Sequence, residues 1–362
     1  MKGIPQIFFM QTFGILLVVF GHSFYLFPPD NPILQWIYAF PLPFFFFISG
    51  YLLHYTHPQT NQVVLPGRKG YLTRRARRLL LPYVVISSLV FVPKALMSQY
   101  SVRPVQLTWH DYIDNLIYPF HNVMAAYWFI PTLFLIMFLF MMVARLGLCK
   151  YRYIVLGASL LLYAFVDYGF DSLLNIRGVC HFFIFFVAGY YFHQSRAEQL
   201  FHNCPLWKTL PTTLLLSLLP LLSLQSVWLD LFTAFNGIAL SMCLAQSYER
   251  LGLTFLNHLY GATYYIYLFS GFFQILVLQV LLHFVHLPAI AFIPLATLFG
   301  VYGPWAMYRF WKGKRSMNVI RNVNVLCLTI IILNLSYNAL RDNRYDRHYT
   351  STVVDDFLTD YE

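Results

Sequence analysis

The residue best suited to do chemistry is His22, which lies in the segment Gly14-Ile-Leu-Leu-Val-Val-Phe-Gly-His-Ser23, within an apolar run that lasts from about Ile7 to Phe27. An ionisable side chain within hydrocarbon costs several kcal/mol unless it is paired, so such residues usually face a bundle interior or a cavity. A neutral imidazole is also well suited to take a proton from an alcohol near pH 7. Two interpretations therefore stay open: a general base, or a structural histidine that is hydrogen-bonded to a neighbouring helix.

Gln11 lies eleven residues before His22, which is about three helical turns and roughly 16 Å along one helix face. Both side chains can therefore line the same groove at different depths. For an isolated glutamine in a spanning helix, a hydrogen bond to another helix is the default explanation.

A basic cluster, Arg74, Arg75, Arg77 and Arg78, precedes the apolar segment that begins Leu79-Leu-Leu-Pro-Tyr83. Guanidinium groups spread over one and a half helical turns form a site for phosphates through bidentate hydrogen bonds. A basic cluster beside a membrane helix also fixes orientation and contacts anionic lipids. The residues alone do not separate these two roles.

The segment Phe44-Phe-Phe-Phe-Ile-Ser-Gly-Tyr51 places Ser49 and Gly50 among bulky aromatic side chains. Small residues let another helix approach closely, so packing is the favoured interpretation of this segment. Pro41 and Pro43 lie in the same predicted span and would kink it. A kink frees backbone groups that neighbours, or water in a cavity, must then satisfy.

The composition indicates that spanning helices position these residues. Of the 362 residues, 59% are hydrophobic and only 10% are charged, whereas a soluble domain is typically about a quarter charged. A spanning helix needs roughly 20 apolar residues. We therefore predict an all-α, polytopic transmembrane bundle with ten spans at about 7–27, 33–53, 79–98, 124–144, 153–168, 178–193, 209–226, 228–247, 262–283 and 287–308, and a weaker eleventh at about 323–340.

The charge distribution predicts the orientation of the bundle. The net charge is +10, and most of the basic residues fall in alternate loops that become cytoplasmic if the N-terminus is inside. This is the bias of the positive-inside rule, so we predict a cytoplasmic N-terminus and no nucleic-acid partner. The orientation places His22 toward the outer face and the arginines at the inner face.

Residues 1–340 are predicted to form one membrane-embedded domain, and residues 341–362 a polar, disordered tail. The apolar run near the N-terminus has no small-residue cleavage site, so a retained first helix is favoured over a signal peptide. The five cysteines have no paired spacing, and no metal motif is present. Several polar residues near the predicted outer ends could line an acceptor site, without diagnostic spacing: Trp109, His110, Asp111, His121, Asp167, Asp171, Arg177, His181 and Asp230.

Several of these segments together resemble the acyltransferase type 3 family, the polytopic enzymes that acylate cell-surface polysaccharides. They are the first-helix segment Gly14-Ile-Leu-Leu-Val-Val-Phe-Gly-His22, Phe46-Phe-Ile-Ser-Gly-Tyr-Leu-Leu53, the Arg-x-x-Arg cluster before Leu-Pro-Tyr83, Tyr127-Trp-Phe-Ile-Pro131 and Ala262-Thr-Tyr-Tyr-Ile-Tyr-Leu-Phe269. The resemblance covers roughly residues 1–310. Two positions depart from the family pattern: members commonly carry Arg or Lys where this chain has Gln11, and often His where it has Ser270.

The resemblance implies an O-acyltransferase of a bacterial inner (plasma) membrane. It would move an acyl group, acetyl by preference, from cytosolic acyl-coenzyme A to a hydroxyl of a surface or lipid-linked glycan, with no permanently bound cofactor. His22 matches the essential histidine. The donor would meet Gln11 and either Arg74/Arg77 or Arg75/Arg78. Contacts to the substrate are expected from Trp128, His181, Tyr264, Tyr267 and Ser49.

Other mechanisms and functions also stay open. His22 could activate the acceptor directly, or carry the acyl group as a covalent acyl-histidine. A transporter or flippase for a glycan or small solute would also have kinked helices and buried polar groups, but it predicts inverted internal repeats, which the sequence lacks. A catalytically inactive protein is suggested by Gln11 and Ser270.

Overall fold

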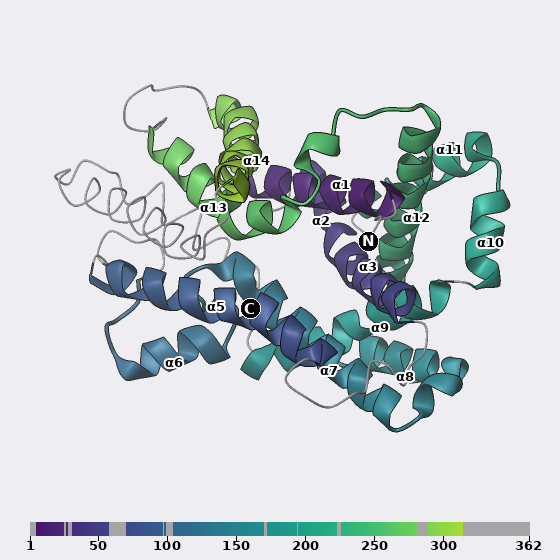
Figure 1. Ribbon diagram of the computed structural model, residues 1–362, viewed down its shortest axis with the longest axis horizontal. Helices are drawn as coiled ribbons and strands as arrows, with labels where there is room; N and C mark the ends of the chain where they lie inside the picture. Colours follow the sequence, from purple (N-terminus) through teal and green to yellow (C-terminus); the bar gives the residue numbers. More distant parts are fainter. Residues whose placement is uncertain are drawn as a thin grey trace. The chain divides into compact units, whose positions relative to one another are not determined.

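The computed structural model describes residues 5–24, 27, 31–57, 70–96, 98, 104–169, 172–193, 195–222, 226–280 and 289–313. Within these residues the secondary structure is helical, with no strand, which confirms the predicted all-α class (Figure 1). Seven helical segments are long and apolar enough to cross a membrane, and three shorter apolar helices cover the remaining predicted spans up to residue 308. The predicted eleventh span (323–340), the tail (341–362) and Asp171 lie outside the described residues.

The helices that cover the ten predicted spans are α1 (Pro5–His22), α2 (Pro32–Tyr38) with α3 (Pro41–Thr56), α5 (Tyr71–Leu96), α7 (Phe129–Arg145), α8 (Arg152–Phe165), α9 (Ile176–Phe192), α11 (Leu206–Leu216), α12 (Val227–Arg250), α13 (Thr263–Val280) and α14 (Ala289–Gly313). Two further helices, α6 (Trp109–Ile117) and α10 (Arg196–Asn203), lie in the connections between spans. A short 3₁₀ turn, Ala125–Trp128, leads into α7.

The first helix is shorter than predicted. We expected it to continue to about residue 27, but α1 ends at His22. The backbone N–H groups of Ser23 and Phe24 bond to carbonyls three residues earlier, at 3.0 and 3.1 Å, and such i→i−3 bonds tighten the last turn of a helix. His22 is therefore the last residue of the helix instead of lying within it.

The second predicted span is also not one kinked helix. It consists of α2 and α3, and Pro41 stands in the first turn of α3. Proline is well tolerated there because the first helical N–H groups have no intrahelical partner. Pro41 and Pro43 therefore begin a helix, whereas we expected them to bend one.

The chain divides into two compact units, which are described separately. The first unit draws on Met1–Tyr38, Leu89–Thr108 and Tyr248–Glu362, and the second on Ala39–Ser88 and Trp109–Ser247. In the first unit α1 packs against α2, α13 and α14, and in the second α9 packs against α3, α7 and α8.

The contact between α3 and α9 is a crossing of two glycines. A Cβ atom on Gly50 would collide with the Phe186 carbonyl, and one on Gly189 would collide with the Phe47 carbonyl. Each glycine thus admits the backbone of the other helix, as small residues do between membrane helices. This confirms that the segment around Gly50 serves close helix packing.

The glycine crossing makes Gly50→Ala destabilising, because the new methyl group meets rigid backbone instead of a side-chain tip that can move. Overpacking of this kind typically costs about 1–3 kcal/mol, so the detergent-solubilised variant should lose its folded peak at a lower temperature in size-exclusion thermal scans. Gly157→Ala in α8 is the matched control, since no heavy atom lies within 4 Å of its added Cβ. Equal melting temperatures for the two variants would contradict the close crossing.

Candidate functional site

His22 stands at the C-terminal end of α1 with its side chain exposed. Its ring centroid lies 6.4 Å from that of Tyr38, at the end of α2. Within the described residues the imidazole makes no hydrogen bond, whereas the structural interpretation required one to a neighbouring helix. A neutral imidazole in this state offers one nitrogen as an acceptor and one as a donor to a ligand.

The residue after His22 has the opposite character, because the Ser23 side chain is fully buried. Its hydroxyl donates to the Val19 carbonyl at 2.9 Å and accepts from the amide of Gln274 in α13 at 3.0 Å. The hydroxyl of Thr297 in α14 lies 2.9 Å from the same Ser23 oxygen. Sequence reasoning missed Gln274 and Thr297; the signal for them was a polar side chain in an apolar span.

Gln11 is half-buried on α1, and its amide makes no hydrogen bond to any residue that the structure describes. The start of the same helix is attached by other residues. The Gln6 amide donates to the Glu249 carboxylate at 2.7 Å, and the Phe9 ring packs 4.6 Å from that of Tyr248. Gln11 is thus not needed to anchor α1 within the first unit.

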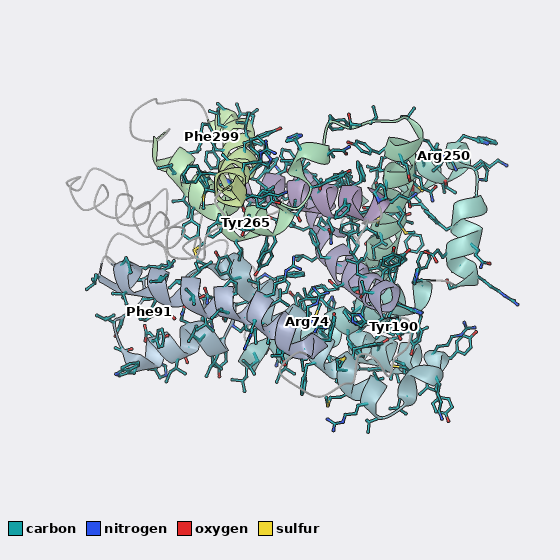
Figure 2. All side chains as sticks on the ribbon, viewed as in Figure 1. Arg74, Phe91, Tyr190, Arg250, Tyr265 and Phe299 are labelled. Carbon is teal, nitrogen blue, oxygen red and sulfur yellow. The ribbon has the colours of Figure 1, made fainter. Side chains whose placement is uncertain are left out.

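The arginine cluster lies at the N-terminal end of α5, in the second unit, where Arg74 is labelled in Figure 2. Arg74, Arg77 and Arg78 are exposed, while Arg75 is half-buried. The Arg75 guanidinium carbon lies 5.1 Å from the centre of the Tyr71 ring, a cation–π contact. Of the two Arg-x-x-Arg registers, Arg74/Arg77 is the one in which both guanidinium groups are exposed.

His57, which follows α3, lies beside this cluster. Its ring packs edge-on against Tyr71 with a centroid separation of 5.3 Å. Burial lowers the pKa of His57 below its ordinary value, and the positive charges of Arg74 and Arg75 lower it further. The pKa of His57 therefore depends in part on the charges of Arg74 and Arg75.

Two of the expected substrate contacts, Trp128 and His181, lie in one aromatic stack of the second unit. The Trp128 ring is nearly parallel to that of Phe182 at 5.7 Å, and His181 lies 4.9 Å from Phe182. His181 also lies 4.4 Å from Tyr163 and 4.6 Å from Tyr168. Both side chains are half-buried, so they present only part of their surface to a ligand.

The other expected substrate contacts are not part of this stack. The Ser49 hydroxyl donates to the Phe45 carbonyl of its own helix at 2.8 Å. Tyr264 and Tyr267, on α13 of the first unit, are half-buried with ring centroids 6.5 Å apart. Within the second unit, the structure thus brings Trp128 and His181 together, whereas the Ser49 hydroxyl is used in a hydrogen bond within its own helix, α3.

Asn175, a residue that sequence reasoning missed, determines where the helix carrying His181 begins. It has a left-handed backbone (φ 53°), and its side-chain oxygen accepts from the Gly178 N–H at 3.3 Å. Its amide nitrogen donates to the Thr132 hydroxyl at 2.7 Å. Asparagine tolerates this backbone conformation and caps helix starts. The side chain therefore joins α9 to α7.

A helix bundle with these features is typical of polytopic membrane enzymes. The family model described as an acyltransferase domain, that of the acyltransferase type 3 family, matches residues 5–309, from the start of α1 into the last turns of α14. The chain belongs to this family and is an integral membrane acyltransferase. Neither a curated protein nor a solved structure matches the sequence.

The charge field at His57 predicts how its pKa responds to Arg75→Gln. Removing one positive charge favours the charged imidazolium, so the pKa of His57 should rise toward the ordinary value of 6.5. The measurement is a pH titration of the labelled imidazole by NMR in detergent micelles. Arg152→Gln removes the same charge beside Tyr153 and should leave His57 unchanged; a pKa that is equal in all three proteins would contradict the assignment.

Proposed function

We propose that this protein is an O-acyltransferase that moves an acyl group, acetyl by preference, from cytosolic acyl-coenzyme A to a hydroxyl of a cell-surface or lipid-linked glycan, with His22 as the general base. The observation that carries the proposal is the contrast at the end of α1. Ser23 is buried and hydrogen-bonded, while the neighbouring His22 is exposed and makes no hydrogen bond within the described residues. An ionisable group that is not used for structure in this class of protein is by default a functional one.

In the proposed reaction, His22 accepts the proton of the acceptor hydroxyl as the oxygen attacks the thioester carbonyl carbon. The tetrahedral intermediate collapses with cleavage of the C–S bond, and the coenzyme A thiolate leaves. The imidazolium then returns its proton to that thiolate or to solvent, so His22 is neutral again. General-base catalysis of this kind typically contributes about 10²–10⁴-fold.

The donor is assigned to the second unit, because coenzyme A is a polyanion and the exposed arginines on α5 suit its phosphates. We propose the Arg74/Arg77 register, since both of these side chains are exposed whereas Arg75 is half-buried. A cytoplasmic N-terminus, in the inner membrane of a bacterium, would place these arginines on the side where coenzyme A occurs. Gln11 supplies a hydrogen-bond donor but no charge, so the arginines would carry the electrostatic attraction.

Membership of an acyltransferase family favours this function over the transporter and the inactive protein that the sequence left open. Wild-type protein that shows neither coenzyme A binding nor acyl transfer would reverse that preference.

His22→Ala should reduce acyl transfer in purified membranes by at least about 100-fold, because no other base would take the hydroxyl proton. The measurement is transfer of radiolabelled acetyl groups to glycan at equal amounts of folded protein. His258→Ala is the matched control, since that histidine is exposed, stacks on Tyr302 and is not among the residues assigned to the donor or the acceptor. Wild-type transfer by His22→Ala would refute both direct transfer and an acyl-histidine relay, and an acyl group found on His22 when acceptor is withheld would favour the relay.

The double variant Arg74→Gln, Arg77→Gln should raise the KM for acetyl-coenzyme A by about tenfold or more, because each charge-assisted hydrogen bond contributes about 1.5–3 kcal/mol. The thermal stabilisation that coenzyme A gives the wild type should be lost in parallel. Lys150→Gln with Arg152→Gln removes the same charge from residues that stack on Tyr151 and Tyr153. If this control raised the KM equally, the effect would be general surface charge and the assigned donor site would be wrong.

A further inference from the structure

The helix end that carries His22 is held by side chains from two other helices. The last four carbonyls of any helix lack a complete set of intrahelical partners, and Val19 provides one of these carbonyls in α1. It accepts a hydrogen bond from the Ser23 hydroxyl at 2.9 Å and another from the Gln274 amide at 2.8 Å. We call Val19, Ser23, Gln274 and Thr297 the Ser23 clasp.

The direction of each hydrogen bond in the clasp follows from which atoms carry a proton. A carbonyl oxygen cannot donate, so the amide nitrogen of Gln274 must face Val19. Its two N–H groups serve Val19 and Ser23. The single proton of Ser23 goes to Val19, which leaves the Ser23 oxygen as an acceptor. Gln274 therefore satisfies two groups of α1 at once.

Thr297 makes a weaker contribution than Gln274. Its hydroxyl lies 2.9 Å from the Ser23 oxygen and 2.7 Å from the Ile293 carbonyl of its own helix. One proton can serve only one of these acceptors at a time. Losing this hydroxyl should thus disturb the helix end less than losing the Gln274 amide.

The stem of Gln274 is also confined by close packing. A Cβ atom on Gly300, one turn after Thr297, would lie 2.9 Å from the Val19 Cγ1 atom and 3.0 Å from the Gln274 Cγ atom. The α14 backbone therefore presses on both side chains, and Gln274 has little room to adopt another rotamer. Because Val19, Ser23 and Gln274 are buried, the hydrogen bonds among them are stronger than they would be in water.

We propose that Gln274 and Thr297 are positioning residues for His22: by holding the Ser23 side chain and the Val19 carbonyl, they set the direction in which the imidazole leaves the end of α1. This rests on the role of His22 as base in the proposed function. A displacement of about 1 Å at a reacting group can cost about 10²-fold in rate. The clasp is one residue away from the imidazole, so its loss acts directly on that position.

The test compares Gln274→Met, which keeps the length of the side chain but removes the amide, with Thr297→Val and Thr297→Ser. Gln274→Met should lower kcat by about 10- to 100-fold while the KM for acetyl-coenzyme A stays within about twofold. Thr297→Val should show a smaller loss, and Thr297→Ser should retain wild-type kcat because it keeps the hydroxyl. Thr212→Val is the control, since the exposed Thr212 hydroxyl donates to the Lys208 carbonyl of its own helix and lies outside the clasp.

A second readout does not depend on catalysis. The rate at which diethyl pyrocarbonate modifies His22, followed by mass spectrometry of the peptide that carries it, should change in Gln274→Met and Thr297→Val but not in Thr297→Ser. Wild-type kcat and modification rate in Gln274→Met would overturn the positioning role. So would a loss of activity that merely follows the folded fraction measured by size exclusion. If His22→Ala stays active while the modification rate still changes in Gln274→Met, the proposed base is wrong but the clasp is supported.

Discussion

Buried polar groups in a spanning helix have no water to bond with, and this constraint governs the end of α1. The Val19 carbonyl and the Ser23 hydroxyl are satisfied by each other and by Gln274, which lies 251 residues from Ser23 in the sequence. The network is complete without His22. Among the residues that the structure describes, the imidazole makes no hydrogen bond, which is compatible with the role of general base that we propose for it.

The second unit is held together by a different interaction. The glycine crossing of α3 and α9 brings two backbones into direct contact, and the aromatic rings around Phe182 fill the space beside it. Asn175 then joins the start of α9 to Thr132 of α7. At the N-terminal end of α5 three arginines are exposed, while the fourth, Arg75, lies against Tyr71. The close helix packing of the second unit thus lies in α3, α7 and α9, whereas the exposed arginines lie on α5.

Much of the fold was predictable because the hydropathy of a helix depends only on the residues of that helix. Long apolar runs predicted where the apolar helices of the described residues lie, seven of which are long enough to cross a membrane, and Gly50 was correctly predicted as a packing residue. The errors occur at helix ends that lie inside an apolar run, because the hydropathy does not change where the helix stops or starts. The apolar run that ends near Phe27 contains a helix that stops at His22, and Pro41 begins a helix in a span that reads as continuous.

The sequence by itself determined the class of protein, the approximate positions of the long apolar helices and several residues able to do chemistry, because side-chain polarity and its spacing are properties of the chain alone. Only the tertiary structure decided which of those residues are already occupied. Arg75 lies against Tyr71, and Trp128 and His181 lie in one aromatic stack, whereas His22 makes no hydrogen bond to any described residue. Only the tertiary structure likewise showed that Gln274 and Thr297 contact Ser23, next to His22. A hydrogen bond depends on the distance between atoms in space, and residues hundreds of positions apart in the sequence carry no local sign that they meet.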